Sequence, residues 1–369
     1  MRPAIRTSVA VESASLRDCD AIIDTRSPAE FAEDHIPGAI SCPVLDNEER
    51  ARVGTMYKQV SPFEARKLGA ALVARNIARH IEMRFMANEK NWKPLVYCWR
   101  GGKRSGAMAH ILREIGWEAK SLEGGYKSYR RYVVSALAEL PAKITFRVIH
   151  GVTGSGKSRL LRSLAATGAQ VLDLEDLAAH RGSLLGTLPD RPQPSQKMFE
   201  SRLLQKILSF DARKEVYVEG ESRKIGQLQV PEALIERMRA SECLSLQTDT
   251  ATRVALLMDE YRHFFADVTK LGALLDCLVG MHSRERIGEW KALAAAGDWA
   301  ALVTRLLEEH YDPAYLRSAP SNFPLLAMAR SLRVASADAA AFDAAAHELA
   351  GIFARASSAS LFATKNTNS

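Results

Sequence analysis

The first 135 residues alternate between short apolar runs and longer stretches in which apolar positions recur at helical spacing. The runs AIID (21–24) and LVYC (95–98) are predicted to be strands. Residues 62–87 and 105–117 are predicted to be helices. Ser27 followed by Pro28 indicates the start of another helix, because serine caps helices and proline fits the first turn. Strands alternating with helices predict a parallel α/β sheet.

The same pattern begins again after Pro141, which ends a predicted connecting helix at 128–143. A helix is predicted at 158–168, and strands are predicted at 145–150, 169–175, 214–222 and 244–249. Residues 251–355 are mainly helical by pattern. We therefore predict two α/β domains in series, at 1–135 and 145–355, with a connecting segment at 136–144 and a disordered tail at 356–369.

The composition is that of a soluble globular protein, with 47% hydrophobic and 25% charged residues among 369. Five cysteines, an odd number without a CxxC pair, argue against a disulfide framework or a structural zinc site. No stretch has the apolar length of a signal peptide or a transmembrane helix, so we expect a cytoplasmic protein with no membrane partner.

The net charge of +7 is compatible with a polyanionic partner. Cations between Arg75 and Arg104 interleave with Trp92, Tyr97 and Trp99, a mixture that suits base stacking and phosphate contacts. A solvated helix face beside a core strand would produce the same pattern.

The segment GVTGSGKS at 151–158 satisfies the phosphate-loop pattern GxxxxGK[ST]. It follows a β-branched strand and opens a helix, so its backbone amides and the helix dipole would hold phosphate oxygens. We predict that Lys157 meets the terminal phosphate and that Ser158 could hold Mg²⁺. The phosphate-binding residues would be Gly151, Thr153, Gly154, Ser155, Gly156, Lys157 and Ser158. The loop alone does not decide between a nucleotide and another phosphate ligand.

Further residues are candidates for the same site. Glu219 ends an apolar strand and is a candidate acidic partner, as is Glu221. His180 and Arg181 follow a predicted strand near the expected ligand edge, where helix termination is the rival explanation. Arg223 would contact a phosphate-bearing ligand, or begin a solvated helix.

Cys98 stands between a predicted strand and a predicted helix, in the loop CWRGGKRS. Convergent backbone amides, the helix dipole and nearby cations would lower the pKa of its thiol and stabilise a thiolate or persulfide. The loop residues are Arg100, Gly101, Gly102, Lys103, Arg104 and Ser105. The spacing also satisfies Cys-x5-Arg-Ser, a phosphatase-type anion cradle, and spacing alone does not separate the two chemistries.

A second set of elements resembles the rhodanese domain over about residues 10–135: DTR (24–26), EF (30–31) and HIPGA (35–39), followed by the Cys98 loop. With the phosphate loop, nearly the whole chain resembles the tRNA 2-selenouridine synthase family. The supporting segments are YCWRGGKRS (97–105), LEGGYKSYR (122–130), LDLEDLAAHRGS (172–183), QPSQKMFE (193–200) and VEGESRKIG (218–226). In rhodanese-like folds Asp24 and Arg26 lie beside the active loop and are usually structural; His35 we expect to be packed.

This resemblance implies a tRNA-modifying enzyme that replaces the sulfur of 2-thiouridine at the wobble position with selenium from selenophosphate. It also implies transfer of a geranyl group from geranyl diphosphate to that sulfur, which then leaves. Cys98 would accept selenium as a perselenide or otherwise handle the donor, and the phosphate loop would grip geranyl diphosphate, selenophosphate or a nucleotide, of which we favour the first. No tightly bound cofactor is expected.

The main alternative is a phosphate-loop kinase or NTPase with a regulatory rhodanese domain, which acts as a sulfurtransferase or as a Cys-x5-Arg phosphatase. A non-catalytic RNA-binding or persulfide-carrier protein is a further possibility.

Overall fold

The computed structural model describes residues 8–11, 18–183 and 185–350. They divide into two compact units, one that runs to Leu137 and also includes Pro194–Gln205, and one that comprises Ala138–Gln193 and the chain from Lys206 onward. Both units have an α/β fold, which confirms the predicted fold class. The predicted tail at 356–369 lies outside the described residues.

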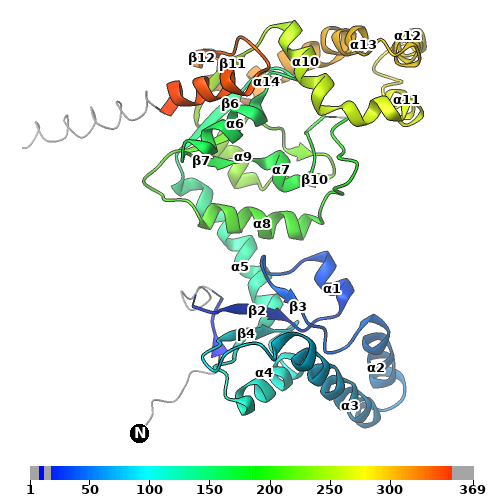
Figure 1. Cartoon of the computed structure of the whole chain (residues 1–369), viewed down its shortest axis with the longest axis vertical. Helices are drawn as coiled ribbons and strands as arrows, with labels where there is room; N and C mark the ends of the chain where they lie inside the picture. Colours follow the sequence, from blue (N-terminus) through cyan, green and yellow to red (C-terminus); the bar gives the residue numbers. More distant parts are fainter. Residues whose placement is uncertain (1–7, 12–17, 184, 351–369) are drawn as a thin grey trace, which may run out of the picture. The chain divides into compact units, whose positions relative to one another are not determined.

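The first unit is built on a parallel five-stranded sheet in the order β1-β5-β4-β2-β3 (Figure 1). Its strands are β1 (Ser8–Val9), β2 (Ala21–Asp24), β3 (Ile40–Ser41), β4 (Pro94–Tyr97) and β5 (Lys120–Leu122). Its helices are α1 (Pro28–Glu33), α2 (Asn47–Gln59), α3 (Pro62–His80), which continues as a π-helical turn at Ile81–Phe85, α4 (Lys103–Ile115) and α5 (Gly125–Glu139). The predicted strands at 21–24 and 95–98 are therefore confirmed to within one residue.

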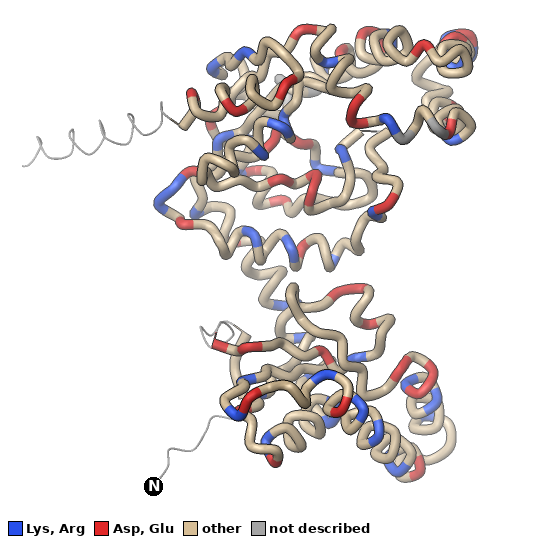
Figure 2. Tube along the Cα trace, viewed as in Figure 1, with Lys and Arg blue, Asp and Glu red and all other residues tan. Residues whose placement is uncertain are grey.

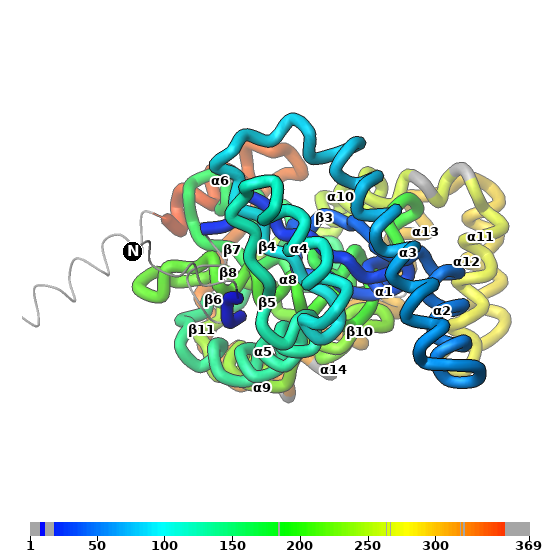
Figure 3. Tube along the Cα trace, turned by 90° about the horizontal axis from the view of Figure 1, so that it is seen from below, coloured from blue at the N-terminus to red at the C-terminus, as the bar shows by residue number. Residues whose placement is uncertain are grey.

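Local signals explain where these helices begin. Ser27 caps α1 in a capping box with Glu30, and Pro28 occupies the first turn. Helix α2 was not predicted, because it buries none of its side chains and so has no apolar stripe. Helices α2 and α3 form a helical hairpin and lie side by side (Figures 1 and 3). Gly69 of α3 faces Val53 of α2 where the two helices pack.

The core of this unit lies between the sheet and its helices. Ile23 and Val96 from the two central strands meet Met108 and Leu112 from α4, and all four are fully buried. Trp92 and Trp117 pack edge to face with ring centroids 5.0 Å apart. These contacts fix the carboxyl end of β4, where the Cys98 loop begins.

One helix from the second half of the sequence belongs to the first unit. Most of α8 (Gln196–Leu208) groups with it through Pro194–Gln205. Glu200 forms an ion pair with Arg130 of α5, and the Lys197 ammonium lies 2.6 Å from the Glu33 carboxylate. No element was predicted from the sequence at 196–208, and nothing in the sequence indicated that this segment would group with the first unit.

The second unit also has a parallel five-stranded sheet, in the order β12-β11-β6-β8-β7. Its strands are β6 (Phe146–His150), β7 (Gln170–Leu172), β8 (Val216–Glu219), β11 (Glu242–Gln247) and β12 (Arg330–Arg333), and β9 (Lys224–Ile225) pairs with β10 (Leu228–Gln229) in a separate antiparallel ribbon. Strand β7 ends earlier than the predicted 169–175, because Asp173 caps a short helix. Strand β12 lies in a region predicted to be helical, so that prediction was wrong at this strand.

Helices surround this sheet and extend beyond it. They are η3 (Leu140–Lys143), α6 (Lys157–Ala166), α7 (Leu174–Ala178), α9 (Glu232–Arg239), α10 (Thr250–Glu260), η4 (Arg262–Ala266), α11 (Val268–Asp276), α12 (Arg284–Ala296), α13 (Trp299–Leu306), η5 (Leu307–Tyr311), α14 (Asp312–Asn322), η6 (Pro324–Met328) and helical residues 339–350. Among the described residues, no helix is both long and apolar enough to cross a membrane.

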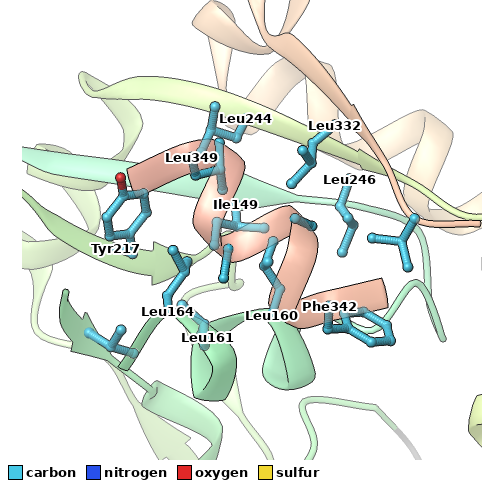
Figure 4. Packing of buried hydrophobic residues seen from close by; sticks show 14 of the residues in the cluster. Ile149, Leu160, Leu161, Leu164, Tyr217, Leu244, Leu246, Leu332, Phe342 and Leu349 are labelled. Carbon is cyan, nitrogen blue, oxygen red and sulfur yellow. The ribbon is translucent and has the colours of Figure 1, made fainter. Parts of the chain in front are cut away.

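Figure 4 shows the core that supports the phosphate loop. Leu160 and Leu164 of α6 face Ile149 of β6, and Phe342 and Leu349 from helical residues 339–350 close the same cluster. All five are at most 1% exposed. The strand before the loop and the helix after it are thus packed together by apolar contacts that leave the loop itself at the sheet edge.

Candidate functional site

The Cys98 loop follows β4 and turns into α4. The Cys98 side chain is 3% exposed. Its Sγ accepts hydrogen bonds from the Gly102 amide at 3.3 Å and from the Ser105 hydroxyl at 3.2 Å. The loop therefore curls round the sulfur as the sequence predicted.

The pKa of the Cys98 thiol is lowered from its ordinary value. Burial is the largest single influence and raises the pKa, but several hydrogen bonds to the sulfur together outweigh it. They come from the hydroxyl and amide of Ser105 and from the amides of Arg100 and Gly102. Directed hydrogen bonds, rather than the neighbouring cations, are thus the cause of the shift.

The segment LEGGY (122–126) holds the loop from the other side. The Tyr126 amide donates to the Cys98 carbonyl at 2.8 Å. A Cβ on Gly125, whose φ is +59°, would collide with the Cys98 carbonyl and the Gly101 amide, and a Cβ on Gly101 would lie 2.7 Å from the Leu122 carbonyl. The glycines of this segment are needed because backbone meets backbone there.

Asp24 and Arg26 are buried beside the segment that packs against the Cys98 loop, and the contacts that they make are structural, as expected for them. Arg26 is 1% exposed and forms an ion pair with Asp24, with 2.6 Å between Nη2 and Oδ2. It also donates to the Asp34 carbonyl at 2.6 Å and stacks over the Tyr126 ring at 3.9 Å. Arg26 thus ties the DTR element to the segment that packs against the Cys98 loop. His35 stacks on Phe31, in line with the packed role expected for it.

Two of the predicted cations of this unit are paired with acids. Arg104 lies 3.1 Å from the Glu30 carboxylate and Arg75 lies 3.0 Å from that of Glu49. Acidic positions lie at the starts of α2 and α3 and basic positions follow along both helices (Figure 2). Arg100 and Lys103 are exposed on the loop itself.

In the second unit the phosphate loop leaves β6 and enters α6. Its first and last parts are bonded to each other, since Lys157 Nζ donates to the Gly151 carbonyl at 3.0 Å. Gly154 and Gly156 have φ of +77° and +88°, and a Cβ on Gly154 would lie 2.7 Å from Leu257. The glycines are therefore required by both backbone conformation and packing.

Buried contacts from α10 and α14 brace this loop. Arg253, which is 4% exposed, donates from Nε to the Thr153 carbonyl at 2.9 Å and makes a two-pronged ion pair with Asp312 at 2.9 and 2.6 Å. Thr248 donates its hydroxyl to the Ser155 carbonyl at 2.9 Å. These residues were not predicted from the sequence, where the only signal is the charge of Arg253 on an otherwise apolar helix face.

Carboxylates gather beside Lys157 and Ser158 where β7 and β8 end. Ser158 donates its hydroxyl to Glu175 at 3.1 Å, and the Glu175 amide donates to Glu219 at 2.9 Å. Glu219 Oε2 is buried and has no hydrogen-bond partner among the described residues. The sequence analysis named Glu219 and Glu221 but missed Glu175, because the short helix α7 hides it in what reads as a continuous strand.

This crowding raises the pKa of each carboxyl group. Burial and then the neighbouring Glu221 raise the pKa of Glu175 to about 8, although Lys157 and Ser158 oppose the shift. Burial first, and then Asp173 and Glu175, raise the pKa of Glu219 well above its usual range. His150 shows the reverse, because burial and Lys157 lower its pKa to about 4. The raised pKa values favour the protonated forms of these carboxyl groups. A cation or a phosphate ligand bound nearby would change their protonation.

A pocket of about 320 Å³ opens over the phosphate loop. Of the further candidates from the sequence, Arg181 and Glu221 line it, whereas His180 and Arg223 do not. Arg223 forms an ion pair with Glu232. Within the described residues, no group of three His, Cys, Asp or Glu side chains is arranged to hold a metal ion; Ser158 and Glu175 are nevertheless oxygen donors of the kind that Mg²⁺ uses together with phosphate oxygens.

Two family models match the chain, one in each unit. Residues 10–132 match the family model of the rhodanese-like domain, and residues 144–271 match that of the tRNA 2-selenouridine synthase AAA domain. The chain belongs to the tRNA 2-selenouridine synthase family. The family predicted from the sequence is thereby confirmed.

Several bacterial relatives carry the name tRNA 2-selenouridine synthase. The protein from Nitrosomonas europaea is 36% identical over 65% of this chain and 63% of its own length. Those from Bdellovibrio bacteriovorus and Shewanella halifaxensis are 37% and 36% identical, over 65% and 66% of this chain and 64% and 66% of their own lengths. The chain thus spans a little under two thirds of the length of these relatives.

Proposed function

We propose that this chain replaces the sulfur of 2-thiouridine in tRNA with selenium from selenophosphate, by way of an S-geranylated intermediate made from geranyl diphosphate. The observation that carries the proposal is the presence, in one chain of this family, of a thiol with a lowered pKa and a separate phosphate loop with its own pocket. Two distinct anion-binding loops suit a reaction with two distinct phosphorylated substrates.

The phosphate loop serves the first step. The sulfur of 2-thiouridine attacks C1 of the geranyl group, a carbon–sulfur bond forms, and the carbon–oxygen bond breaks as diphosphate leaves with the electron pair; N3 of the base loses its proton. Lys157 must give up its bond to the Gly151 carbonyl to meet the diphosphate charge. When bound, Mg²⁺ would neutralise charge on the leaving diphosphate.

Alkylation prepares the base for the second step. Hydrogen selenide ion attacks C2, a carbon–selenium bond forms, and the carbon–sulfur bond breaks as geranylthiolate leaves and takes a proton from solvent; the proton of the selenide passes to N3 of the base. Selenium and sulfur both keep their oxidation states, so this exchange needs no external oxidant.

Cys98 serves the release of selenide from selenophosphate. Its thiolate attacks phosphorus, a sulfur–phosphorus bond forms, and the phosphorus–selenium bond breaks; water then hydrolyses the phosphorylated cysteine to phosphate and the free thiolate. The amides of the Cys98 loop and Arg100 hold the anionic donor. A perselenide on Cys98 would instead require a two-electron oxidant, because the thiol sulfur and the selenium of selenophosphate are both fully reduced.

The experiment is nucleoside mass spectrometry of tRNA from a deletion strain complemented with the wild type, Cys98→Ser or Lys157→Ala. We expect Cys98→Ser to lose selenouridine but keep the geranylated nucleoside, and Lys157→Ala to lose both. Selenouridine at wild-type levels in every strain, the uncomplemented one included, would refute the proposal. Robust ATP turnover that depends on Lys157 and ignores Cys98, without any altered nucleoside, would support the kinase or NTPase alternative.

A further inference from the structure

The phosphate-loop pocket adjoins a second cavity of different chemistry. This second cavity measures about 50 Å³ and shares four lining residues with the pocket above the loop. The shared residues are Thr153, Leu257, Tyr261 and Tyr311. This second space, which we call the side cavity, is therefore next to the place where a phosphate on the loop would be bound.

The walls of the side cavity are mainly apolar. Most of the lining comes from α10, η4, α11, α13 and η5, with Thr153, Leu185 and Tyr261 from the segments between elements, and no lining residue is charged. Leu271, Leu302 and Leu307 are at most 4% exposed, and Phe265 stacks on Trp299 with ring centroids 4.5 Å apart. Such a lining favours a hydrocarbon over any polar group.

The two tyrosines mark the border between the polar and apolar parts. The Tyr261 hydroxyl lies 3.2 Å from the Ser183 hydroxyl, and Tyr311 also forms a side-chain hydrogen bond with Ser183. The hydroxyl groups of Tyr261 and Tyr311 are thus bonded to Ser183, and both residues line the pocket above the phosphate loop as well as the side cavity. Ser183 itself lines only the pocket above the phosphate loop.

Size limits what the side cavity can take. An engineered protein cavity that binds benzene has about 150 Å³, about three times the volume found here. The side cavity can therefore hold only the last few carbons of a chain that begins on the phosphate loop, and Leu257, Tyr261 and Tyr311 would line the carbons between. Val303 and Trp299 lie in its wall and are only partly buried, so substitutions there change its volume without removing a fully buried side chain.

We propose that the side cavity binds the end of a short branched hydrocarbon chain whose diphosphate occupies the phosphate loop, and that Val303 and Trp299 set the longest chain accepted. The inference rests on the proposed function for the nature of the ligand and adds where the chain lies and what limits it. It predicts that affinity rises from a five-carbon to a ten-carbon chain and falls at fifteen carbons.

Binding of unreactive ligands tests this without any transfer reaction. Calorimetry of the full chain would use inorganic diphosphate and the dimethylallyl, geranyl and farnesyl thiolodiphosphates, in which sulfur replaces the bridging oxygen. For the wild type we expect the geranyl compound to bind at least about 100-fold more tightly than inorganic diphosphate, since each buried CH₂ group adds about 0.8 kcal/mol. Equal affinities would overturn the inference.

Two substitutions act in opposite directions. Val303→Phe should fill the side cavity and weaken the geranyl compound about 10-fold or more, while inorganic diphosphate stays within about 2-fold. Trp299→Ala should enlarge it and raise the ratio of farnesyl to geranyl affinity about 10-fold. Leu316→Phe, on an exposed part of α14, is the control for an added aromatic ring. It should change neither the affinity for the geranyl compound nor the ratio of farnesyl to geranyl affinity.

The outcomes separate this inference from the proposed function. If the wild type binds the geranyl compound tightly and Val303→Phe abolishes the preference, the side cavity is assigned even if no base is ever geranylated, in which case the proposed function fails alone. If bases are geranylated but both substitutions leave the order of affinities unchanged, the side cavity is not the chain-binding site.

Discussion

The Cys98 loop and the phosphate loop share a local plan, a strand followed by a glycine-containing loop and a helix, but they affect the charge of their side chains in opposite ways. At Cys98 the hydrogen bonds of Ser105 and Gly102 favour the charged form of the thiol. At the phosphate loop, burial and crowding favour the neutral forms of Glu175 and Glu219. The surroundings of Cys98 therefore favour a nucleophilic thiolate. At the phosphate loop, the carboxyl groups would release protons when a positively charged ion binds beside them.

The largest effect that separates the two loops is expected from Gly125→Ala. The added methyl group collides with backbone atoms of Cys98 and Gly101. We expect this collision to displace the Cys98 sulfur from the groups that donate hydrogen bonds to it. Displacement of reacting groups by about 1 Å can cost about 100-fold in rate, and we expect such a loss in selenouridine formation measured on purified tRNA.

Geranyl transfer by the same variant should stay within about 2-fold, because the phosphate loop belongs to the other unit. Gly116→Ala is the matched control: Gly116 also has a positive φ, of +107°, but nothing lies within 4 Å of the added atom. If both variants lose activity equally, backbone strain rather than contact with the Cys98 loop explains the effect.

The next effect concerns the brace of the phosphate loop. Arg253→Met leaves Asp312 without its partner and frees the Thr153 carbonyl. Breaking a buried pair on one side costs about 3 kcal/mol, which we expect as a fall in the free energy of unfolding in urea. The exposed ion pair of Lys291 with Asp276 supplies the control, and Lys291→Met should cost less than about 1 kcal/mol. Equal costs would show that Arg253 does not brace the loop.

How far the sequence alone leads differs between the two loops. GVTGSGKS and CWRGGKRS predicted both loops, because contiguous residues build each of them. Glu175, Arg253 and Gly125 lie 17, 100 and 27 positions from the residues they support, and nothing in a single sequence joins such distant positions. The place of α8 in the first unit and the apolar side cavity were missed for the same reason, since each depends on contacts between distant segments.

A smaller effect shows whether hydrogen bonds or nearby cations lower the pKa of the Cys98 thiol. Ser105→Ala removes one donor from the thiolate, so the pKa of Cys98 should rise by about 1–2 units, as expected for a charged hydrogen bond of about 1.5–3 kcal/mol. Because the thiolate is the form that reacts, the midpoint of the alkylation rate against pH should move upward by the same amount.

Arg104→Met provides the comparison for that shift. Arg104 is already paired with Glu30, so its removal should move the midpoint by less than about half a unit. A larger shift for Arg104→Met than for Ser105→Ala would show that cations, and not directed hydrogen bonds, control the thiol.

The smallest effect is on stability at the phosphate loop. With a pKa of about 8, folded Glu175 keeps a proton that the unfolded chain releases above about pH 4.5. The folded state therefore binds more protons between these values, and the free energy of unfolding falls as pH rises from about 5 to about 8.

Glu175→Gln should remove its share of this fall, on the order of 2 kcal/mol between pH 5.5 and 8.5. Urea unfolding at several pH values measures the difference, with exposed Glu308→Gln as the control. A fall of the same size in wild type and Glu175→Gln would contradict the raised pKa.

The division of labour between the two loops is tested most directly by giving Lys157→Ala a tRNA that already carries S-geranyl-2-thiouridine, together with selenophosphate. The account predicts that selenouridine forms at a rate within about 3-fold of the wild type, since the phosphate loop has no further part once the sulfur is alkylated, and that Cys98→Ser forms none from the same tRNA. Failure of Lys157→Ala to make selenouridine from the geranylated tRNA would contradict the assignment of the two steps to the two loops.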